Sequence, residues 1–195
     1  MELNRLMFRE YDIRGIWNED ITEEISYHIG RAYATKLLSF GKNKMIVGYD
    51  NRLSSPIIEE NLVKGLTEGG VNVVRLGLVT TPMYYYAWDK LNIHAGIMIT
   101  ASHNPKEYNG FKVYDETGCQ LVDDKIARVI ALINEVEDET EIDLETFDST
   151  KIHAIDDTFD NIYLDAIKTI QLRRDEPKNI KIVFTSQHGT SYPMV

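Results

Sequence analysis

The sequence predicts an α/β protein in which a mixed, mostly parallel sheet lies between two layers of helices, a three-layer α/β/α arrangement. Two observations lead to this class. Short apolar runs alternate with amphipathic helical stretches along most of the 195 residues. The runs have the length and composition of strands that are covered on both faces. Ligands of such sheets usually bind beyond the carboxyl ends of the strands, so functional residues are expected in the loops that follow strands.

The first hundred residues alternate regularly between expected helices and expected strands. A helix follows the N-cap candidate Thr22, carries apolar residues at helical spacing to Leu37 and stops at Gly41. The next elements are a strand at Lys44–Gly48, a helix opened by Ser55-Pro56, a strand at Val71–Leu76, a helix from Thr81-Pro82 to Leu91, and a buried strand at Ala95–Thr100.

The remaining residues predict the end of one domain and the start of another. A strand is expected at Phe111–Tyr114, followed by a helix after Asp123 with Ile126, Val129, Ile130 and Ile133 on one face. The acidic run 135–145 has no apolar stripe, which is typical of a solvated connection. We therefore expect a first domain over residues 1–150.

Residues 151–195 are predicted to begin a second domain. They contain an expected helix from Phe159 to Ile170 and an expected strand at Lys181–Thr185. One helix and one strand cannot bury a core by themselves, because an isolated strand leaves unpaired backbone groups on both edges. We therefore expect the second domain to be cut short.

Composition excludes several classes of function. Lys and Arg number 21 and Asp and Glu 31, a net charge of −10 that argues against nucleic-acid or anionic-membrane partners. The only cysteine, Cys119, cannot form an internal disulfide, and the five histidines lack the spacing of a zinc site. No signal peptide or long apolar run is visible, so a cytoplasmic protein is expected.

The most informative segment is Thr100–Pro105, with the sequence TASHNP, directly after the expected buried strand. A hydroxyl at Ser102, beside the imidazole of His103 and the amide of Asn104, is a candidate nucleophile or phosphate acceptor. The same residue types also form turns, and composition alone leaves that alternative open.

Three cations in other segments support a phosphate-binding interpretation. Lys112 follows Ser102 by ten residues, and Gly110 permits close backbone approach beside it. Arg14 precedes a glycine, and Arg52 follows an expected strand, so both guanidinium groups can face phosphate oxygens. A lysine in a strand is also common as an edge residue with its charge in water, and this alternative stays open for Lys112.

Taken in order, these segments resemble the α-D-phosphohexomutases, the phosphomannomutase and phosphoglucomutase family. TASHNP at 100–105 is similar to the family's phosphoserine loop, FREYDIRG at 8–15 to its N-terminal motif, and YNGFKV at 108–113 to the segment after the loop. The opening differs from the TDGIRG motif of phosphoglucosamine mutases, which favours the manno/gluco branch. KIVFTSQHGTSY at 181–192 is similar to the start of the family's second domain, with Ser191 in place of a glycine.

The resemblance implies an isomerase of carbohydrate metabolism. It moves phosphate between O1 and O6 of a hexose phosphate through a phosphoserine and a hexose bisphosphate intermediate. The implied catalytic residues are Ser102, Lys112 as general acid/base, Arg14 and His103, and the implied substrate-binding residues are Tyr11, Asn104 and Arg52. The implied cofactors are Mg²⁺, held through the phosphate on Ser102 and by carboxylates of the second domain, and hexose 1,6-bisphosphate as activator.

The family's DGDxDR metal loop, sugar-recognition loop and final phosphate-binding domain do not occur before Val195. We therefore expect the N-terminal portion of a mutase, truncated naturally or deliberately and inactive by itself. The alternative is a non-catalytic module that binds a sugar phosphate or a protein partner. Mannose or glucose preference, the phosphorylation state of Ser102 and the oligomeric state stay open, with self-association through the incomplete second domain one outcome.

Overall fold

The structure, a computed structural model, describes residues 4–9, 11–120, 148–177 and 179–195. The strands in these ranges are β1 (Ile13–Ile16), β2 (Lys44–Tyr49), β3 (Asn72–Leu78), β4 (Gly96–Ile99), β5 (Tyr108–Tyr114) and β6 (Ile152–Ala154). The α-helices are α1 (Glu23–Ser39), α2 (Ser55–Glu68), α3 (Thr81–Lys90) and α5 (Thr158–Thr169). The expected helix after Asp123 and the acidic run 135–145 lie outside the described residues.

The described strands form one sheet in the order β1-β5-β4-β2-β3-β6. β2 pairs in parallel with β3 and β4, and β3 pairs in parallel with β6. β5 is antiparallel to both β1 and β4. The predicted mixed, mostly parallel sheet is therefore confirmed.

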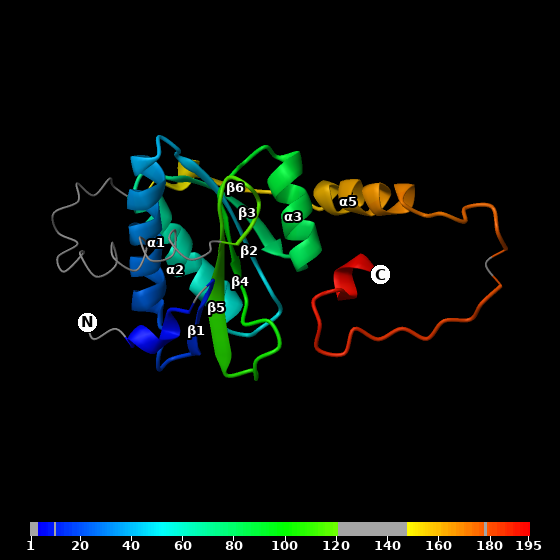
Figure 1. Cartoon of the computed structure of the whole chain (residues 1–195), viewed down its shortest axis with the longest axis horizontal. Coiled ribbons are helices and arrows are strands. Elements are labelled where there is room, and N and C mark those ends of the chain that lie inside the picture. Colours follow the sequence, from blue (N-terminus) through cyan, green and yellow to red (C-terminus); the bar gives the residue numbers. More distant parts are fainter. Residues whose placement is uncertain (1–3, 10, 121–147, 178) are drawn as a thin grey trace.

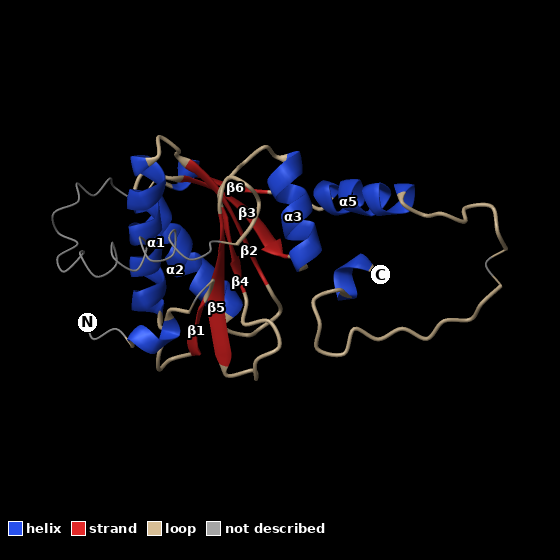
Figure 2. Cartoon of the chain, in the orientation of Figure 1, coloured by secondary structure: helices blue, strands red, loops and turns tan. Residues whose placement is uncertain are grey.

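Helices cover both faces of this sheet. α1 and α2 lie on one side and α3 on the other, with α5 beyond α3 (Figures 1 and 2). Two buried apolar clusters fill the interlayer spaces: one includes Ile29 and Leu62 under α1 and α2, and the other includes Met83 and Tyr84 under α3. Because the chain runs from β2 to β3 and then back across to β4, the crossover helices α2 and α3 lie on opposite faces.

This topology puts two loops side by side at one edge of the sheet. β2 and β4 are parallel neighbours, so their carboxyl ends point the same way. The loop 50–54 after β2 and the loop 100–107 after β4 consequently meet there, which is where ligands bind in open α/β sheets.

Helix starts lie where the sequence predicts them, although Ser55 is the first residue of α2 and not its N-cap. Thr22 Oγ1 accepts the Ile25 N–H at 3.1 Å and caps α1. α2 begins at Ser55 with Pro56 in its first turn. α3 begins at Thr81, where Thr80 Oγ1 accepts the Met83 N–H at 3.4 Å.

The structure differs from the sequence-based expectation in its shortest strands. β1 and β6 were not expected, and β5 begins at Tyr108, three residues before the expected start. β6 pairs with β3, and Phe159 of α5 packs in the cluster under α3, so the first sheet and core extend past residue 150. The domain boundary near residue 150 stays a prediction.

The expected strand at Lys181–Thr185 is wrong for this structure. The segment has no regular secondary structure, and Val183 is fully exposed. No described strand pairs with it, and a strand needs a neighbour to satisfy its backbone groups. None of the described helices combines the length and apolar character needed to span a membrane.

Candidate active site

Ser102 lies exposed at the tip of the loop that follows β4. Its φ is +56°, a left-handed conformation that residues with a Cβ adopt infrequently. The Ser102 N–H donates to Thr100 Oγ1 at 2.9 Å, and the Asn104 N–H donates to the Ala101 carbonyl at 3.0 Å. The loop is therefore a tight turn, as its composition indicates, and the turn leaves the hydroxyl accessible.

His103 is a titratable neighbour of this hydroxyl. Its Nδ1 lies 3.3 Å from Ser102 Oγ, and both side chains are exposed. The hydrogen bond can run in either direction, depending on the imidazole tautomer. His103 is thus placed to orient the Ser102 side chain.

Arg14 reaches the loop from β1. The antiparallel pairing of β1 with β5 puts Arg14 opposite Gly110, directly beside the loop. Arg14 Nη1 donates to Asn104 Oδ1 at 2.7 Å, and Nε and Nη2 contact Asp12 Oδ2 at 2.7 and 2.6 Å. A guanidinium has five N–H donors, so two remain for an anion at this edge.

Gly110 makes this arrangement sterically possible. A Cβ at this position would lie 2.1 Å from the Ile13 carbonyl oxygen and 3.1 Å from that of Thr100. Only glycine allows β1 and the end of β4 to approach β5 this closely. The close backbone approach predicted for Gly110 is confirmed.

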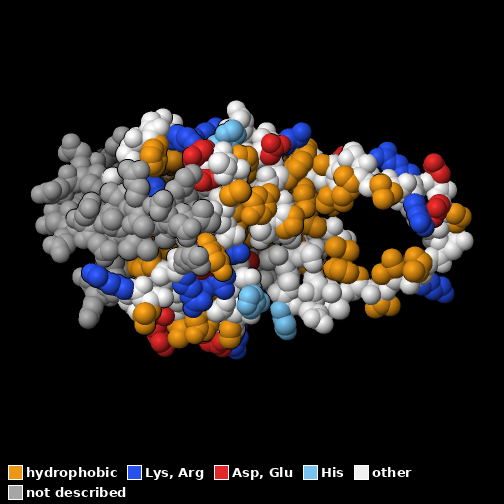
Figure 3. Space-filling view, in the orientation of Figure 1, with side chains coloured by type: hydrophobic (Ala, Val, Ile, Leu, Met, Phe, Trp, Pro, Cys, Tyr) orange, Lys and Arg blue, Asp and Glu red, His pale blue; other side chains and the backbone are white. Residues whose placement is uncertain are grey.

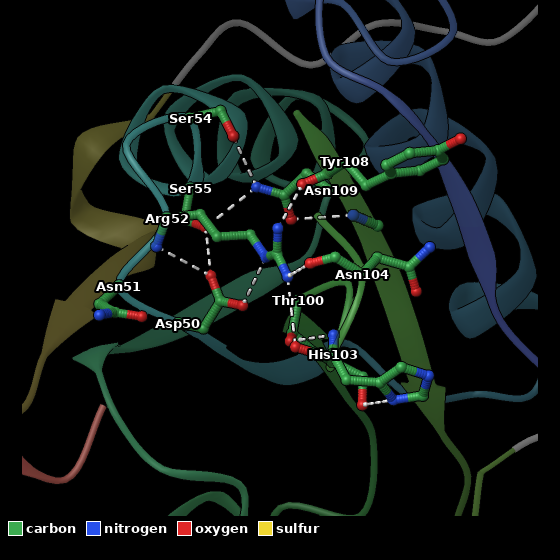
Figure 4. A network of polar contacts seen from close by, with 12 residues as sticks. Asp50, Asn51, Arg52, Ser54, Ser55, Thr100, His103, Asn104, Tyr108 and Asn109 are labelled. Atoms are coloured by element: carbon green, nitrogen blue, oxygen red, sulfur yellow. Dashed lines mark hydrogen bonds and ion pairs between the residues drawn. The ribbon is translucent and has the colours of Figure 1, made fainter. Parts of the chain in front are cut away.

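Arg52 enters from the loop after β2 and makes a different set of contacts (Figure 4). Nη1 donates to the carbonyls of Pro105 at 2.6 Å and Tyr108 at 2.9 Å. Nη2 donates to the carbonyls of Ser102 at 3.2 Å and Asn104 at 2.8 Å. Nε donates to Asp50 Oδ2 at 3.2 Å, so all five donors are used.

A buried polar chain continues from Asp50 to β5. Ser55 Oγ donates to Asp50 Oδ1 at 2.8 Å. The Asn109 amide donates to the hydroxyls of Ser54 at 2.8 Å and Ser55 at 3.0 Å, and its oxygen accepts the Gly110 N–H at 2.8 Å. Six of the ten buried polar residues in the described ranges belong to this edge: Asp12, Asp50, Ser54, Ser55, Thr100 and Asn109. Buried polar groups need hydrogen-bond partners, so this concentration of buried polar residues indicates an organised site at this edge of the sheet.

Lys112 and Tyr11 make no hydrogen bond to the loop. Lys112 is half-buried on β5 opposite Met98, and it makes no hydrogen bond or ion pair with any residue that the structure describes. Its position along β5 puts it on the sheet face that α3 covers, together with Tyr114. Tyr11 is 48% exposed. The structure thus gathers Ser102, His103, Asn104, Arg14 and Arg52 at one edge, and it shows no hydrogen bond from Lys112 or Tyr11 to them.

A second segment approaches the same edge. Asn51 Nδ2 donates to the His188 carbonyl at 2.8 Å, which brings the HGTS segment beside the loop after β2. The resemblance of this segment to the start of a second domain did not indicate the contact.

Metal ligands do not gather here. Among the residues that the structure describes, no group of three or more His, Cys, Asp or Glu side chains is arranged to hold a metal ion. The carboxylates of Asp12 and Asp50 are each paired with an arginine that contacts the loop.

The comparison with protein families decides the identity. Residues 5–140 match the family described as phosphoglucomutase/phosphomannomutase, alpha/beta/alpha domain I. This chain belongs to that family. The phosphohexomutase resemblance read from the three loop motifs is confirmed, and so is the three-layer α/β/α fold.

Known members of the phosphohexomutase family show the same relationship. The chain is 48% identical over 107 residues to a phosphomannomutase/phosphoglucomutase of Pseudomonas putida, covering 55% of this chain and 23% of that protein. It is 41% identical over 131 residues to a phosphoglucomutase of Neisseria gonorrhoeae, covering 67% and 28%. A family protein of Burkholderia thailandensis superposes with a TM-score of 0.74 at 27% identity, covering 89% of this chain and 38% of that one. The chain thus spans about a quarter of the length of these curated relatives.

Proposed function

We propose that the protein acts as a phosphohexomutase on mannose or glucose phosphates, and that Ser102 carries the transferred phosphoryl group. The observation that supports this most strongly is the exposed Ser102 hydroxyl on a turn fixed by hydrogen bonds, beside a guanidinium with two remaining donors. The named relatives are phosphomannomutases and phosphoglucomutases, which supports this substrate class.

Phosphoryl transfer depends mainly on positioning and on neutralising the charge of the phosphoryl oxygens. In the proposed reaction, the bond from phosphorus to Ser102 Oγ breaks as a bond to a free hydroxyl of the hexose phosphate forms. The resulting bisphosphate then returns its other phosphoryl group to Ser102. The phosphate moves between O1 and O6, and the serine ends as it began.

The chain supplies three kinds of assistance to this reaction. Arg14 would donate its two remaining N–H groups to phosphoryl oxygens, with Asp12 holding the guanidinium in place. Lys112 would accept the proton of the attacking hydroxyl and return it in the second transfer. Asn104 and His103 would shape the loop around Ser102, and Tyr11 is a supporting substrate contact.

The cofactors are proposed on the family resemblance. Mg²⁺ prefers oxygen ligands, and the ligand that we assign to it in this chain is the phosphoryl group that Ser102 would carry. The described residues do not form a complete magnesium site, so no step of the reaction is assigned to the metal here. Hexose 1,6-bisphosphate would serve as the activator that phosphorylates Ser102.

The test is turnover by the full-length product of the gene that encodes this chain. Conversion of glucose 1-phosphate and of mannose 1-phosphate to the 6-phosphates is measured with Mg²⁺ and glucose 1,6-bisphosphate present. We expect turnover by the wild type, none above background for Ser102→Ala, and wild-type rates for Ser39→Ala, an exposed serine at the end of α1. Turnover by the Ser102→Ala variant would contradict the proposal. Binding of glucose 6-phosphate without turnover by the wild type would favour the non-catalytic module.

A further inference from the structure

We propose that Arg52 is a positioning residue that clamps the Ser102 loop onto β5, and that it does not bind the substrate phosphate. The proposal rests on the function proposed above, because it assigns a role within that site. It replaces the substrate-binding role that the sequence suggests for Arg52.

Arg52 has no N–H donor left for a phosphate. The five N–H groups of Arg52 are directed at four carbonyl oxygens and one carboxylate oxygen, at 2.6–3.2 Å. A phosphate could be bound only if one of these bonds were broken. Arg14, by contrast, keeps two donors and already faces the loop through Asn104.

Arg52 binds carbonyl groups of both the Ser102 turn and β5. Those of Ser102, Asn104 and Pro105 belong to the turn, and that of Tyr108 belongs to the first residue of β5. The guanidinium therefore joins the residue proposed as nucleophile to the strand that carries Lys112. It also bonds the carbonyl of Ser102 itself, whose left-handed backbone needs support from its surroundings.

The Arg52 side chain is itself held in place by a network of hydrogen bonds. The side chains of Arg52 and Asp50 are only 11% and 12% exposed. Asp50 also accepts the Arg52 N–H at 3.1 Å and the Ser55 hydroxyl, and Ser55 accepts from Asn109 of β5. Figure 4 shows this network passing from the β2 loop through Asp50 and the serines to Asn109. Both ends of the clamp thus rest on the sheet.

Asp50 neutralises Arg52 at close range, so the pair adds little net charge to the site. The effect of Arg52 is therefore geometric, and geometry acts on the chemical step more than on ground-state binding of substrate. Lysine cannot replace it, since an ammonium has three donors and no planar fork to serve carbonyls on both sides.

The test compares Arg52→Lys with Arg75→Lys. Arg75 also pairs with a carboxylate, that of Glu59, but it lies on β3 and touches no loop residue of the site. In the full-length gene product we expect Arg52→Lys to lower kcat about 10- to 100-fold while KM for the hexose phosphate stays within about 2-fold. Arg75→Lys should lower the melting temperature and leave kcat unchanged.

A second readout does not depend on turnover. Amide hydrogen exchange is measured on the 195-residue chain for peptides spanning residues 101–108. We expect faster exchange there in Arg52→Lys and unchanged exchange in Arg75→Lys. If the wild type shows no turnover, the proposed function fails, and the exchange result still decides whether Arg52 clamps the loop.

Three results would overturn the proposal. A raised KM with unchanged kcat would show that Arg52 binds substrate, as the sequence suggests. Wild-type kcat in Arg52→Lys would show that the clamp has no part in the reaction, and unchanged loop exchange would show that there is no clamp.

If Arg52→Lys does not fold, Asp50→Asn takes its place, because the amide oxygen can still accept one bond while the charge that holds Arg52 is lost. The same direction of change is expected.

Discussion

Two arginines at one edge of the sheet illustrate how hydrogen-bond partners distinguish the roles of two residues of the same type. Arg14 and Arg52 both approach the Ser102 loop, and both pair with an aspartate. Arg14 leaves two N–H groups open toward the edge, whereas Arg52 leaves none. This difference is the reason why we propose phosphate binding for Arg14 and loop positioning for Arg52.

Lys112 provides a test of the proposed proton transfer. We expect both Lys112→Gln and Lys112→Arg to lower kcat by roughly 10²- to 10⁴-fold, because neither side chain can accept and return the hydroxyl proton near neutral pH. Steady-state kinetics on the full-length gene product measure this. Near-wild-type kcat in Lys112→Arg would mean that only the positive charge of Lys112 matters.

Glu59 predicts a pH dependence of stability. Burial raises its carboxyl pKa above the ordinary value of 4.5, and the hydrogen bond from Arg75 only partly offsets this. One carboxylate oxygen has no hydrogen-bond partner among the described residues. The folded protein therefore holds the Glu59 proton more tightly than the unfolded chain does. This contribution favours folding most below pH 4.5 and is lost as the pH rises through the raised pKa.

Denaturant unfolding between pH 4 and pH 8 measures that effect. We expect the free energy of unfolding of Glu59→Gln to decline less with rising pH than that of the wild type. The hydrogen bond from the Ile16 N–H is the main reason that the pKa of Asp20 is lowered from its ordinary value of 3.8. The contribution of Asp20 to the free energy of unfolding therefore rises with pH, and it does so mostly below pH 3.8. Equal slopes for the two proteins would contradict the account of Glu59.

At the residue scale, the sequence indicates the candidate reactive groups better than the contacts that support them. Ser102 and Arg14 stand in recognisable motifs, whereas Asp50 and Ser55 do not, and the motif that contains Asn109 does not indicate its partners. Their roles depend on which strands are neighbours: Asn109 of β5 reaches Ser54 and Ser55 across more than fifty residues of chain. Asp50 was within reach of prediction, since it directly follows an expected strand at the ligand-binding edge.

At the level of elements, the crossing of α1 and α2 depends on two glycines. A Cβ at Gly65 would lie 2.1 Å from the Tyr27 carbonyl oxygen, and one at Gly30 would lie 2.3 Å from that of Leu62. These backbone atoms cannot move without shifting a helix, so the helices pack as closely as they do because both residues lack a side chain.

Gly65→Ala tests this contact. Alanine has a helix propensity about 1 kcal/mol better than glycine, yet we expect overpacking to dominate and to lower the free energy of unfolding by about 1–3 kcal/mol. Urea denaturation of the chain gives the value, with Ser39→Ala as a helix-surface control expected within about 0.5 kcal/mol of the wild type. A Gly65→Ala variant as stable as the wild type would refute the close packing.

The elements with strong periodicity or caps were predictable, and the short edge strands were not. α1, α2, α3, β2 and β4 match apolar patterns and capping residues in the sequence. β1 and β6 have four and three residues at the two edges of the sheet, and they lack the continuous buried apolar run that marks the equally short β4. The strand expected at Lys181–Thr185 is absent from the structure. Its apolar pattern is favourable, but no described strand pairs with it.

At the level of the whole molecule, large apolar side chains are exposed along α5 and the C-terminal segment. Figure 3 shows hydrophobic side chains along α5 and along the C-terminal segment. Ile170 is 73% exposed, and Ile182 and Val183 are 76% and 100% exposed. An unpaired apolar segment of strand-forming residues is prone to pair with another chain.

We therefore expect the 195-residue chain to self-associate with increasing concentration. Sedimentation velocity should show this for the wild type, and the double variant Ile182→Asp/Val183→Lys should stay monomeric, because charges on an edge oppose pairing. A monomeric wild type over the same concentrations would contradict this expectation.

The central claim is that the phosphoryl group passes through Ser102. The most direct measurement incubates the full-length gene product with glucose 1,6-bisphosphate carrying radioactive phosphate, maps the labelled peptide and then adds unlabelled glucose 6-phosphate. The account predicts label on Ser102 that passes to the sugar within one turnover. Label on a different residue, or label on Ser102 that the sugar cannot remove, would contradict it.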